Sequence, residues 1–345
     1  MRIVVCSGQI PFVRGGSEIL TDALAEQLRR RGHAVEIVRI PFRWYPKEEI
    51  LKGYLAWRLI NLEESEGQRI DRVIALKFPA YVVPHSHKTV WLVQQFRQAY
   101  DLFNTEYSHF DSSAADTELR QTIRHMDTIS IGEAERIFTI SKNVGARLRR
   151  YNGLDAETLY PPPALDGHYY HAEYGDYVLS MARLNPLKRV DWLIEAMAYT
   201  KTPVRCLIAG RGEETERLQS LAREWGVADR IEFLGFVRDE QAIELYAHAL
   251  AVYYAPLDED YGLATVEAFK SSKPVLTGED SGGVLEFVHD GLSGLVVPSR
   301  DAQALAETID HLYAHREIAA RLGAAGREIV APIHWDVTIE RLLGG

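Results

Sequence analysis

The chain has 345 residues, of which 46% are hydrophobic and 26% charged, and its formal net charge is −10. This length is too great for one ordinary hydrophobic core, so two domains are expected. The charge is uneven, because residues 1–165 hold 22 basic and 20 acidic side chains, a net +2, which leaves −12 for the remainder. Such a balance argues against a general nucleic-acid-binding protein, which needs a basic surface.

The first half reads as strands alternating with helices. RIVVC at residues 2–6 has the pattern of a buried strand, and a loop with Gly15 and Gly16 leads into a helix that Gly32 ends. AVEIVRI, DRVIAL, TVWLV and RIFTI supply further short strands. Strand–helix alternation of this kind is typical of a parallel sheet covered by helices on both faces.

The same alternation restarts after the three consecutive prolines of YPPPALD, residues 160–166, which form a stiff break. Six more strand-like runs follow: DYVLSMARL, VRCLIAG, RIEFLGF, LAVYYAP, KPVLTG and SGLVVP. We therefore predict two doubly wound parallel-sheet α/β domains of similar size, residues 1–160 and 161–332, which face a central cleft. The helical pattern in residues 333–345 is expected to pack back on the first domain.

Targeting and redox signals are few. No segment approaches the roughly 20 consecutive apolar residues that a membrane-spanning helix requires, and the apolar run at residues 3–6 is too short for a signal peptide. Cys6 and Cys206 each lie in a strand-like run, which indicates buried thiols in a reducing compartment and no cysteine-based zinc site. We expect a cytoplasmic protein.

Ligands of open parallel sheets bind beyond the carboxyl ends of the strands, so function should lie in the loops there. After the first strand of the second half, Arg183 and Lys188 stand five residues apart in a loop that opens a helix. Two cations beside a helix N-terminus suit a diphosphate, because they combine neutralising charge with directional donors. Gly210 and Gly212 follow the next strand and add a second glycine loop at the same edge.

The segment DEDYGLATVEA, residues 258–268, places two glutamates eight positions apart. With a helix beginning near Gly262, Glu259 would lie at a strand exit and Glu267 on the second helical turn, so both could line one cleft. Their carboxylates would accept hydrogen bonds from sugar hydroxyls, and the amides of Gly262 and Leu263 would face an anion. Residues 258–260 also mimic an Asp-x-Asp metal clamp, but Arg183 and Lys188 already supply the positive charge, so we expect no metal.

These segments together resemble the family-four retaining glycosyltransferases, which have the GT-B fold of two Rossmann-like domains. GGSE near the start, ISKN at 140, ARLNPLKRVDWLIEA, FLGFV at 233, EDYGLATVEA and SGGVLEFV occur in the order of that family and cover almost the whole chain. The resemblance implies transfer of a hexose from a UDP- or GDP-sugar to an acceptor hydroxyl with retention, in bacterial polysaccharide or glycoconjugate synthesis. It implies neither a metal nor a cofactor.

The resemblance also assigns roles by position. Arg183 and Lys188 would hold the donor diphosphate, Glu259 would contact the transferred sugar, and Glu267 would bind the nucleotide ribose. The remaining donor-binding positions are backbone or glycine sites: Gly16, Gly210, Val237, Tyr261, Gly262 and Leu263. The first domain would bind a saccharide or lipid-linked acceptor, and the second would bind the donor.

One position departs from the family pattern. Many members have a histidine at the end of the strand that matches TVWLV, whereas this chain has Gln94 and Gln95. An amide can donate and accept hydrogen bonds but cannot act as a base, so the role of that histidine is in doubt here. His85 and His87 lie nearby in sequence and read more simply as core or surface residues.

Residues 41–60 interleave aromatic, aliphatic and basic side chains. Such a stretch could rest on the inner face of a membrane that carries a lipid-linked acceptor, or it could be a core-facing helix with a solvated rim. Two other functions also fit the fold: a sugar-nucleotide epimerase on the same scaffold, and a non-catalytic sugar-nucleotide-binding protein. The base, the sugar, the acceptor and the oligomeric state are not determined by the sequence.

Overall fold

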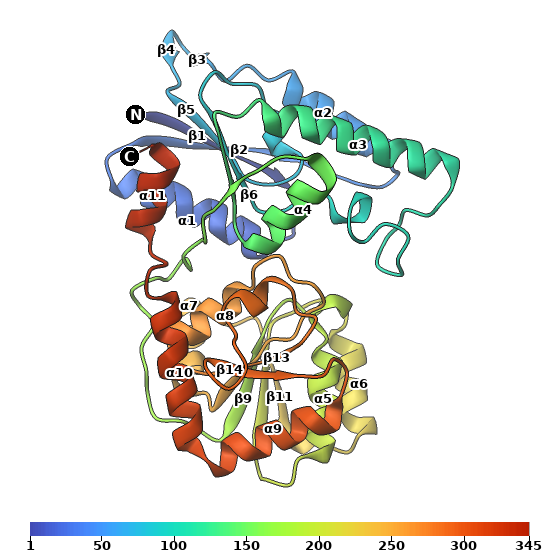
Figure 1. The fold of residues 1–345 in the computed structure, drawn as a ribbon, viewed down its shortest axis with the longest axis vertical. Helices are drawn as coiled ribbons and strands as arrows, with labels where there is room; N and C mark the ends of the chain where they lie inside the picture. The colour runs from blue at the N-terminus through green and yellow to red at the C-terminus, as the bar shows by residue number, and fades with distance from the viewer. Residues whose placement is uncertain (345) are drawn as a thin grey trace. The chain divides into compact units, whose positions relative to one another are not determined.

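The computed structural model describes residues 1–344, which divide into two compact units (Figure 1). Within these residues, unit 1 comprises 1–164 and 335–344, and unit 2 comprises 165–334. The boundary between the two units falls within the proline-rich segment, and the last helix belongs to unit 1. Each unit contains one six-stranded sheet in which all neighbouring strands run parallel.

The sheet of unit 1 has the strand order β2-β1-β5-β6-β7-β8. Its strands are β1 (Arg2–Gln9), β2 (Ala34–Pro41), β5 (Arg72–Ala75), β6 (Lys88–Leu92), β7 (Arg136–Thr139) and β8 (Glu157–Thr158). A separate antiparallel hairpin joins β3 (Glu64–Ser65) to β4 (Gln68–Arg69). Strand order reverses between β1 and β5, and such a switch point is where ligands of open α/β sheets bind.

Two helices of unit 1 begin at a serine whose side chain caps a free amide of the first turn. Ser113 accepts a hydrogen bond from the amide of Asp116, and Ser141 accepts one from the amide of Val144. The helices are α1 (Gly16–Arg30), α2 (Glu49–Arg58), α3 (Ala114–Gly132), α4 (Lys142–Asn152) and α11 (Trp335–Leu343), with 3₁₀ turns η1 (Ala80–Val82) and η2 (Arg97–Ala99).

The terminal helix α11 packs against α1 in unit 1 (Figure 1). Trp335 is buried, and its Nε1 donates to the carbonyl of Pro163 at 3.0 Å. Arg31, just past α1, forms an ion pair with Asp336. These contacts confirm that the closing helix returns to the first domain.

The sheet of unit 2 has the order β11-β10-β9-β12-β13-β14, the 3-2-1-4-5-6 arrangement of a Rossmann fold. Its strands are β9 (Tyr177–Met181), β10 (Arg205–Ala209), β11 (Ile231–Gly235), β12 (Ala251–Tyr253), β13 (Val275–Gly278) and β14 (Gly294–Val297). All six strand-like runs of the second half are thereby confirmed. The switch point lies between β9 and β12.

Unit 2 carries its helices between these strands and after the last one. They are α5 (Val190–Tyr199), α6 (Thr215–Glu224), α7 (Asp239–His248), α8 (Leu263–Lys270), α9 (Ala302–Ala314) and α10 (Arg316–Val330), with 3₁₀ turns η3 (Pro186–Lys188), η4 (Ala228–Arg230) and η5 (Gly283–Glu286).

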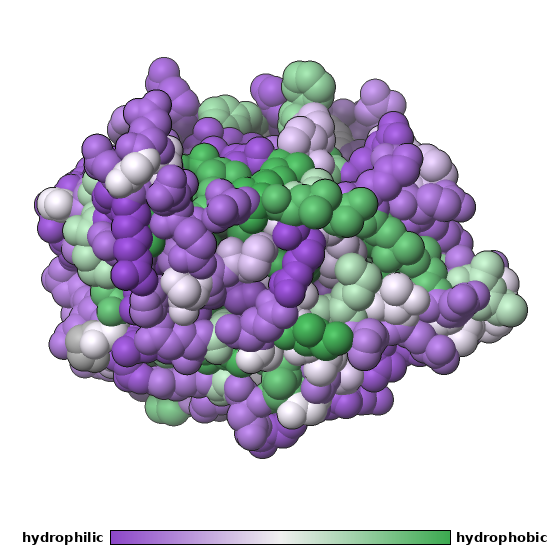
Figure 2. Space-filling model, turned by 90° about the horizontal axis from the view of Figure 1, so that it is seen from above, coloured by the Kyte–Doolittle hydropathy of each residue, from purple (hydrophilic) through white to green (hydrophobic). Residues whose placement is uncertain are grey.

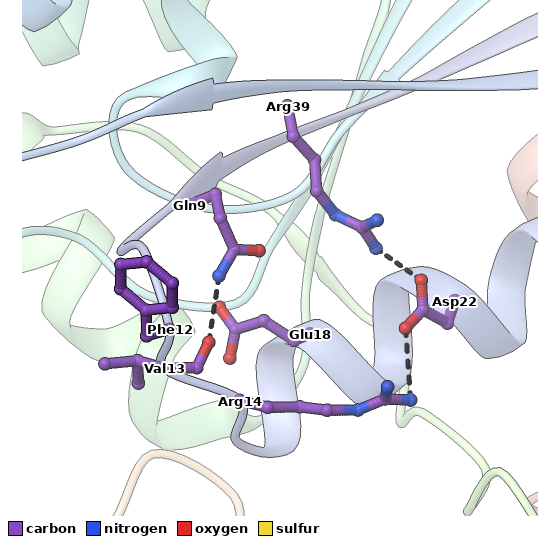
Figure 3. Close-up of a pocket in the computed structure, with 7 residues that line it drawn as sticks. All are labelled: Gln9, Phe12, Val13, Arg14, Glu18, Asp22 and Arg39. Carbon is purple, nitrogen blue, oxygen red and sulfur yellow. Dashed lines mark hydrogen bonds and ion pairs between the residues drawn. The ribbon is translucent and has the colours of Figure 1, made fainter.

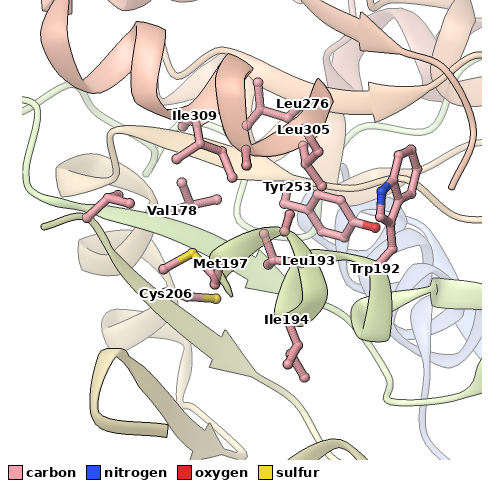
Figure 4. Packing of buried hydrophobic residues seen from close by; sticks show 14 of the residues in the cluster. Val178, Trp192, Leu193, Ile194, Met197, Cys206, Tyr253, Leu276, Leu305 and Ile309 are labelled. Atoms are coloured by element: carbon pink, nitrogen blue, oxygen red, sulfur yellow. The ribbon is translucent and has the colours of Figure 1, made fainter. Parts of the chain in front are cut away.

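A continuous apolar cluster fills the interior of unit 2 (Figure 4). Leu193 and Met197 project from α5 toward the strand residues Val178 and Cys206. Tyr253 meets the Trp192 ring edge-on, with centroids 6.2 Å apart. Burial raises the pKa of the Cys206 thiol, so this cysteine is an inert core residue. This core fixes the strand ends from which the site loops depart.

Within residues 1–344, no helix is both long and apolar enough to cross a bilayer. Cys6 and Cys206 are both buried and form no disulfide. His85 is buried, with its Nδ1 accepting the amide of His87, whereas the His87 side chain is largely exposed.

A buried carboxylate lies in the interior of unit 1. Asp127 of α3 is fully buried and accepts hydrogen bonds from the hydroxyls of Tyr54 and Tyr100, the second at 2.6 Å. Burial raises the pKa of Asp127 to about 7, although the tyrosine hydroxyls act in the opposite direction. Burial also holds the pKa values of Tyr54, Tyr81 and Tyr100 above their usual range, so these phenols do not titrate near neutral pH.

Because the pKa of Asp127 is raised, we expect the stability of the folded protein to depend on pH. An aspartate in the unfolded chain loses its proton near pH 4, whereas folded Asp127 keeps its proton until about pH 7. The folded state therefore binds more protons between these values, and its stability falls as the pH rises through that window. Urea unfolding at pH 4, 5.5 and 7 should show this loss, on the order of a few kcal/mol. The Asp127→Asn variant lacks the group, so an equally steep fall in that variant would contradict the assignment.

Candidate active site

The switch point of unit 2 brings two loops together at the carboxyl edge of the sheet. The loop after β9 contains Arg183 and Lys188, and the loop after β12 contains Tyr254 and Glu259. Because β9 and β12 are hydrogen-bonded neighbours, these loops start side by side although they lie some seventy residues apart in the chain. This is the place where an open α/β sheet binds its ligand.

Lys188 lies between an acid and a phenol. Its ammonium group contacts the Glu259 carboxylate in an ion pair and donates to the Tyr254 hydroxyl at 3.0 Å. Burial by itself would lower the pKa of Lys188, but the nearby Glu259 charge and Tyr254 outweigh it and raise the pKa overall. Lys188 is therefore a fixed cation at this edge, already joined to the first glutamate of the motif.

Arg183 has a looser environment than Lys188. Its side chain is half exposed, and Nη2 lies 3.4 Å from the Glu213 carboxylate in the loop after β10. Such an exposed pair contributes little to stability and can exchange its partner readily. Arg183 thus offers an available guanidinium beside the switch point.

Glycines let the loops after β9 and β10 pack directly on one another. A Cβ on Gly210, whose φ is +135°, would lie 1.8 Å from the carbonyl oxygen of Ala182, and one on Gly212 would lie 1.9 Å from that of Leu184. The amide of Leu184 donates to the carbonyl of Arg211 at 3.0 Å. Gly210 and Gly212 therefore hold the backbone that precedes Lys188.

Arg189 is a buried anchor beneath this loop. It is 3% exposed, has a left-handed backbone with φ +50°, and forms a two-pronged ion pair with Asp280 at 2.6 and 2.9 Å. It also donates to the carbonyls of Ala255 and Pro256 at 2.8 and 2.7 Å. Arg189 ties the Lys188 turn to the loops after β12 and β13, a role that the sequence did not reveal.

The start of α8 presents backbone groups next to Lys188. Gly262 precedes the helix with φ +85°, and a Cβ there would come within 3.1 Å of the Tyr254 ring. Tyr261 is buried with its ring edge-on to Phe287, and a backbone contact of this residue with a ligand stays a prediction. Leu263 is the first helical residue, as expected.

Glu267 lies on the second turn of α8 and accepts a hydrogen bond from the Tyr246 hydroxyl at 2.7 Å. Tyr169 is a second hydrogen-bonding neighbour. Burial raises the pKa of Glu267, and the two phenols act in the opposite direction. The carboxylate is thus preset by phenol donors, and hydroxyl donors of a ligand could join or replace them.

Val237 lies in the loop after β11, at the edge of a cavity of about 420 Å³. Leu234, Phe236 and Leu245 supply apolar walls there, and the acids Glu240 and Glu244 border it. A cavity with apolar walls and an acidic border suits a flat ring whose edges carry polar groups. The role of Val237 toward a nucleotide base stays a prediction.

The predicted residues of unit 1 lie at the carboxyl edge of its own sheet. Gly16 begins α1, and the preceding amide of Gly15 donates to the Glu18 carboxylate at 2.9 Å. Glu18 in turn forms a buried ion pair with Lys77, which follows β5 and also donates to Ser17 at 2.8 Å. The glycine loop is thus held against the exit of β5, across the switch point of this sheet.

Gln94 and Gln95 differ in their surroundings. Gln95 is 1% exposed, and its amide nitrogen donates to the Asn152 side chain at 2.6 Å, within the polar network that includes Tyr100. Gln94 is only partly buried. Gln95 is consequently placed to support the interior, and Gln94 is the better placed of the two to meet a ligand; both acceptor roles stay predictions.

No group of three or more His, Cys, Asp or Glu side chains in residues 1–344 is arranged to hold a metal ion. The Asp258–Asp260 segment lies in the loop after β12, next to the Lys188 ammonium through Glu259. Lys188 balances the charge of the Glu259 carboxylate, and independence of a metal stays a prediction.

Sequence patterns missed three supporting residues: Tyr254, Tyr246 and Arg189. Tyr254 could have been noticed because it directly follows a buried strand, where side chains face the ligand edge. Tyr246 lies on a helix far from Glu267 in sequence, and no local signal joins the two. Arg189 is one of three neighbouring basic positions, and only burial separates it from the others.

Comparison with known proteins bears on this site. The family model "Glycosyl transferases group 1" matches residues 170–329, almost all of unit 2. A GDP-mannose-dependent alpha-(1-6)-phosphatidylinositol monomannoside mannosyltransferase of Mycobacterium tuberculosis is 33% identical over 207 residues, 55% of this chain. The chain spans about half the length of that relative, 53%.

Two further similarities extend over nearly the whole chain. A D-inositol 3-phosphate glycosyltransferase of Nocardia farcinica is 30% identical over 384 aligned positions, which cover 95% of this chain and 84% of that protein. The structure of a sucrose-phosphate synthase from Thermosynechococcus elongatus superimposes with a TM-score of 0.78 at 19% identity, covering 99% and 97% of the two chains. Fold, length and sequence agree: the chain belongs to the group 1 family of glycosyl transferases.

Proposed function

We propose that the protein transfers a hexose from a nucleotide-diphosphate sugar, a UDP- or GDP-sugar, to the hydroxyl of a saccharide or lipid-linked acceptor. The observation that carries the proposal is the Lys188 cation at the switch point of unit 2, paired with Glu259 and bounded by the Gly262 turn. A diphosphate leaving group develops negative charge as the sugar departs, and a preset cation stabilises this charge most in the transition state.

The other residues take roles around that cation. Arg183 is exposed enough to close on the second phosphate, and the Gly262 and Leu263 amides add directional donors at the start of α8. Once the diphosphate engages Lys188, Glu259 can turn its oxygens toward the hydroxyls of the transferred sugar. Glu267, oriented by Tyr246, would receive the ribose hydroxyls.

Unit 1 would bind the acceptor. A role of Gly16 toward the donor rests on the resemblance to the retaining family. We propose that the reaction needs neither a metal nor a cofactor, because Lys188 and Arg183 provide the positive charge that a metal would otherwise bring to the diphosphate. Retention at the anomeric carbon is part of the proposal and rests on the resemblance to the retaining family.

The direct test is an assay with and without acceptor. Nucleotide sugars that raise the melting temperature identify the donor, since binding stabilises the folded state. Incubation of that donor with an acceptor panel should release nucleoside diphosphate and form a glycoside, whose anomeric proton coupling reports retention, in EDTA as well as in magnesium. Rearrangement of the sugar without nucleotide release would instead indicate an epimerase, and binding without any turnover would indicate a binding protein.

The M. tuberculosis relative is named for GDP-mannose and a phosphatidylinositol mannoside. On this ground we place GDP-mannose first in the donor panel, ahead of the UDP-sugars, and include lipid-linked acceptors. A role in bacterial polysaccharide or glycoconjugate synthesis, in the cytoplasm at the inner face of the membrane, follows from such an acceptor.

One surface feature supports membrane contact. Helix α2 buries Ile50, Tyr54 and Trp57 on one side, yet Leu51, Leu55 and Leu59 recur every fourth residue and are 37, 58 and 74% exposed. Figure 2 shows a band of hydrophobic surface across the face that is uppermost in Figure 1. An exposed apolar row of this kind can rest in the headgroup region of a bilayer.

We therefore expect the protein to co-sediment with vesicles that contain anionic lipid, and the Leu55→Glu/Leu59→Glu variant to lose most of this binding. Both side chains are exposed, so folding should be unaffected. Leu292→Glu, at a leucine of unit 2 that is 52% exposed, is the matched control and should still bind. Failure of the wild-type protein to bind such vesicles would remove the membrane contact from the proposal.

A further inference from the structure

Unit 1 contains a pocket of about 290 Å³ that none of the roles above uses (Figure 3). It lies between the end of β1, the loop that follows, the first turns of α1 and β2. The loop supplies Phe12 and Arg14, the helix supplies Asp22, and β2 supplies Arg39. Its volume is sufficient for a phosphorylated sugar or polyol rather than for a whole nucleotide sugar.

Two arginines share a single carboxylate in this pocket. Arg39 forms an ion pair with one oxygen of Asp22, and Nη2 of Arg14 lies 3.3 Å from the other oxygen (Figure 3). Glu18 also lines the pocket, but it is neutralised by the buried Lys77. The two arginines and Asp22 together therefore carry a net charge of about +1. Among the described residues, each of the two guanidiniums makes only this one contact, so most of their N–H groups can reach a ligand.

Phe12 is the second unusual feature. Its ring is fully exposed, and its backbone has φ +63°, a conformation that is rare for residues other than glycine. An exposed aromatic side chain on a strained backbone brings no visible packing benefit. Strain of this kind concentrates at ligand-binding positions, and an aromatic face is a common platform for the C–H groups of a sugar ring.

Hydrogen bonds within the chain hold the pocket wall in place. The Gln9 side-chain amide donates to the carbonyls of Ile10 and Val13 at 2.8 and 2.9 Å, which fixes the loop that carries Phe12 (Figure 3). Glu18 fixes the other end of the loop through the Gly15 amide. A preformed site loses less entropy on binding than a flexible loop would.

We propose that this pocket is the acceptor subsite and that it recognises a phosphorylated sugar or polyol, with Arg14 and Arg39 on the phosphate and Phe12 under the carbon skeleton. The inference rests on the proposed sugar transfer and names the acceptor class for it. Guanidinium groups are suited to this task because they bind phosphate oxygens with paired, charge-assisted hydrogen bonds. Asp22 holds the two arginines in place until the phosphate arrives.

The test measures acceptor binding by calorimetry on the full chain, with the donor site filled by the nucleoside diphosphate, UDP or GDP, that stabilises the protein. The probes are myo-inositol 1-phosphate, glucose 6-phosphate and glycerol 3-phosphate, each beside its unphosphorylated form, and inorganic phosphate. We expect at least one phosphorylated probe to bind at least tenfold more tightly than both its neutral form and inorganic phosphate. The inference is overturned if no probe does so.

Variants separate the two halves of the site. Arg14→Gln/Arg39→Gln should weaken binding of the preferred probe at least tenfold. Phe12→Ser, at a fully exposed position, should also weaken binding of that probe but leave the affinity for inorganic phosphate unchanged. Arg30→Gln, at the far end of α1 where Arg30 pairs with Glu26 at 3.0 Å, is the control and should behave as the wild type. If the double variant matched this control, the phosphate assignment would be wrong.

The same experiment keeps this inference apart from the proposed function. Absence of any binding to nucleoside diphosphates would contradict the donor site in unit 2. Normal nucleotide binding without preference for phosphorylated probes would contradict only the pocket in unit 1.

Discussion

Lys188→Ala is expected to lower turnover at least a hundredfold, equivalent to about 3 kcal/mol of transition-state stabilisation. The ammonium group is held at the sheet edge by Glu259 and Tyr254, so its position is set before the donor arrives. In the proposed reaction, the substitution takes away the cation that would face the departing diphosphate. Because that charge develops mainly in the transition state, kcat should fall more than donor affinity. Steady-state kinetics with the donor found by thermal shift measures both quantities.

Folding is not expected to limit this variant. Both Lys188 and Glu259 are partly exposed, so water can solvate the carboxylate after the substitution. Lys201→Ala, at an exposed lysine just past α5, removes the same charge from the same unit and should keep wild-type turnover. Near-normal turnover of Lys188→Ala, with the circular dichroism spectrum unchanged, would refute the role assigned to this cation.

Arg189→Met is expected to lower the free energy of unfolding by about 3 kcal/mol, since it leaves the carbonyls of Ala255 and Pro256 without the donors that Arg189 supplies and also breaks its ion pair with the partly exposed Asp280. Arg189 is 3% exposed and its guanidinium joins three loops through Asp280, Ala255 and Pro256. Methionine fills a similar volume but donates no hydrogen bond. Urea unfolding followed by tryptophan fluorescence should show the loss, and turnover should also fall because the Lys188 turn is released.

A surface ion pair provides the comparison. Arg205 and Asp176 lie 3.0 Å apart with both side chains about half exposed. Arg205→Met should change stability by about 1 kcal/mol or less, as exposed pairs usually do. Equal effects of the two substitutions would show that Arg189 is not an anchor.

The fold was predictable because its signals are local. Short apolar runs such as RIVVC and VRCLIAG recur between helical segments, and all eleven strands expected from them are present. The hairpin of β3 and β4 and the short β8 were missed because they are exposed or only two residues long, so they carry no hydrophobic periodicity. The helix α8 begins at Leu263, as the glycine before it indicated.

The site was predictable only in part. Residues at strand exits, such as Lys188 and Glu259, could be found because parallel strands bring their following loops to one edge. The ion pair between Lys188 and Glu259 could not be predicted from the sequence, since it depends on how two side chains from different loops are oriented. Gln94 and Gln95 looked alike in sequence, and only burial distinguishes them. Arg189, Tyr246 and the Phe12 pocket depend on tertiary packing that no local pattern encodes.

The proposed function requires the donor diphosphate to bind at the switch point between β9 and β12. The most direct measurement is a crystal structure of the protein with the nucleoside diphosphate that stabilises it. We predict phosphate oxygens within hydrogen-bonding distance of the Lys188 ammonium and the backbone amides at Gly262 and Leu263, with the ribose at Glu267. A nucleotide bound elsewhere, with the Lys188–Glu259 ion pair unchanged and out of its reach, would contradict this placement of the donor.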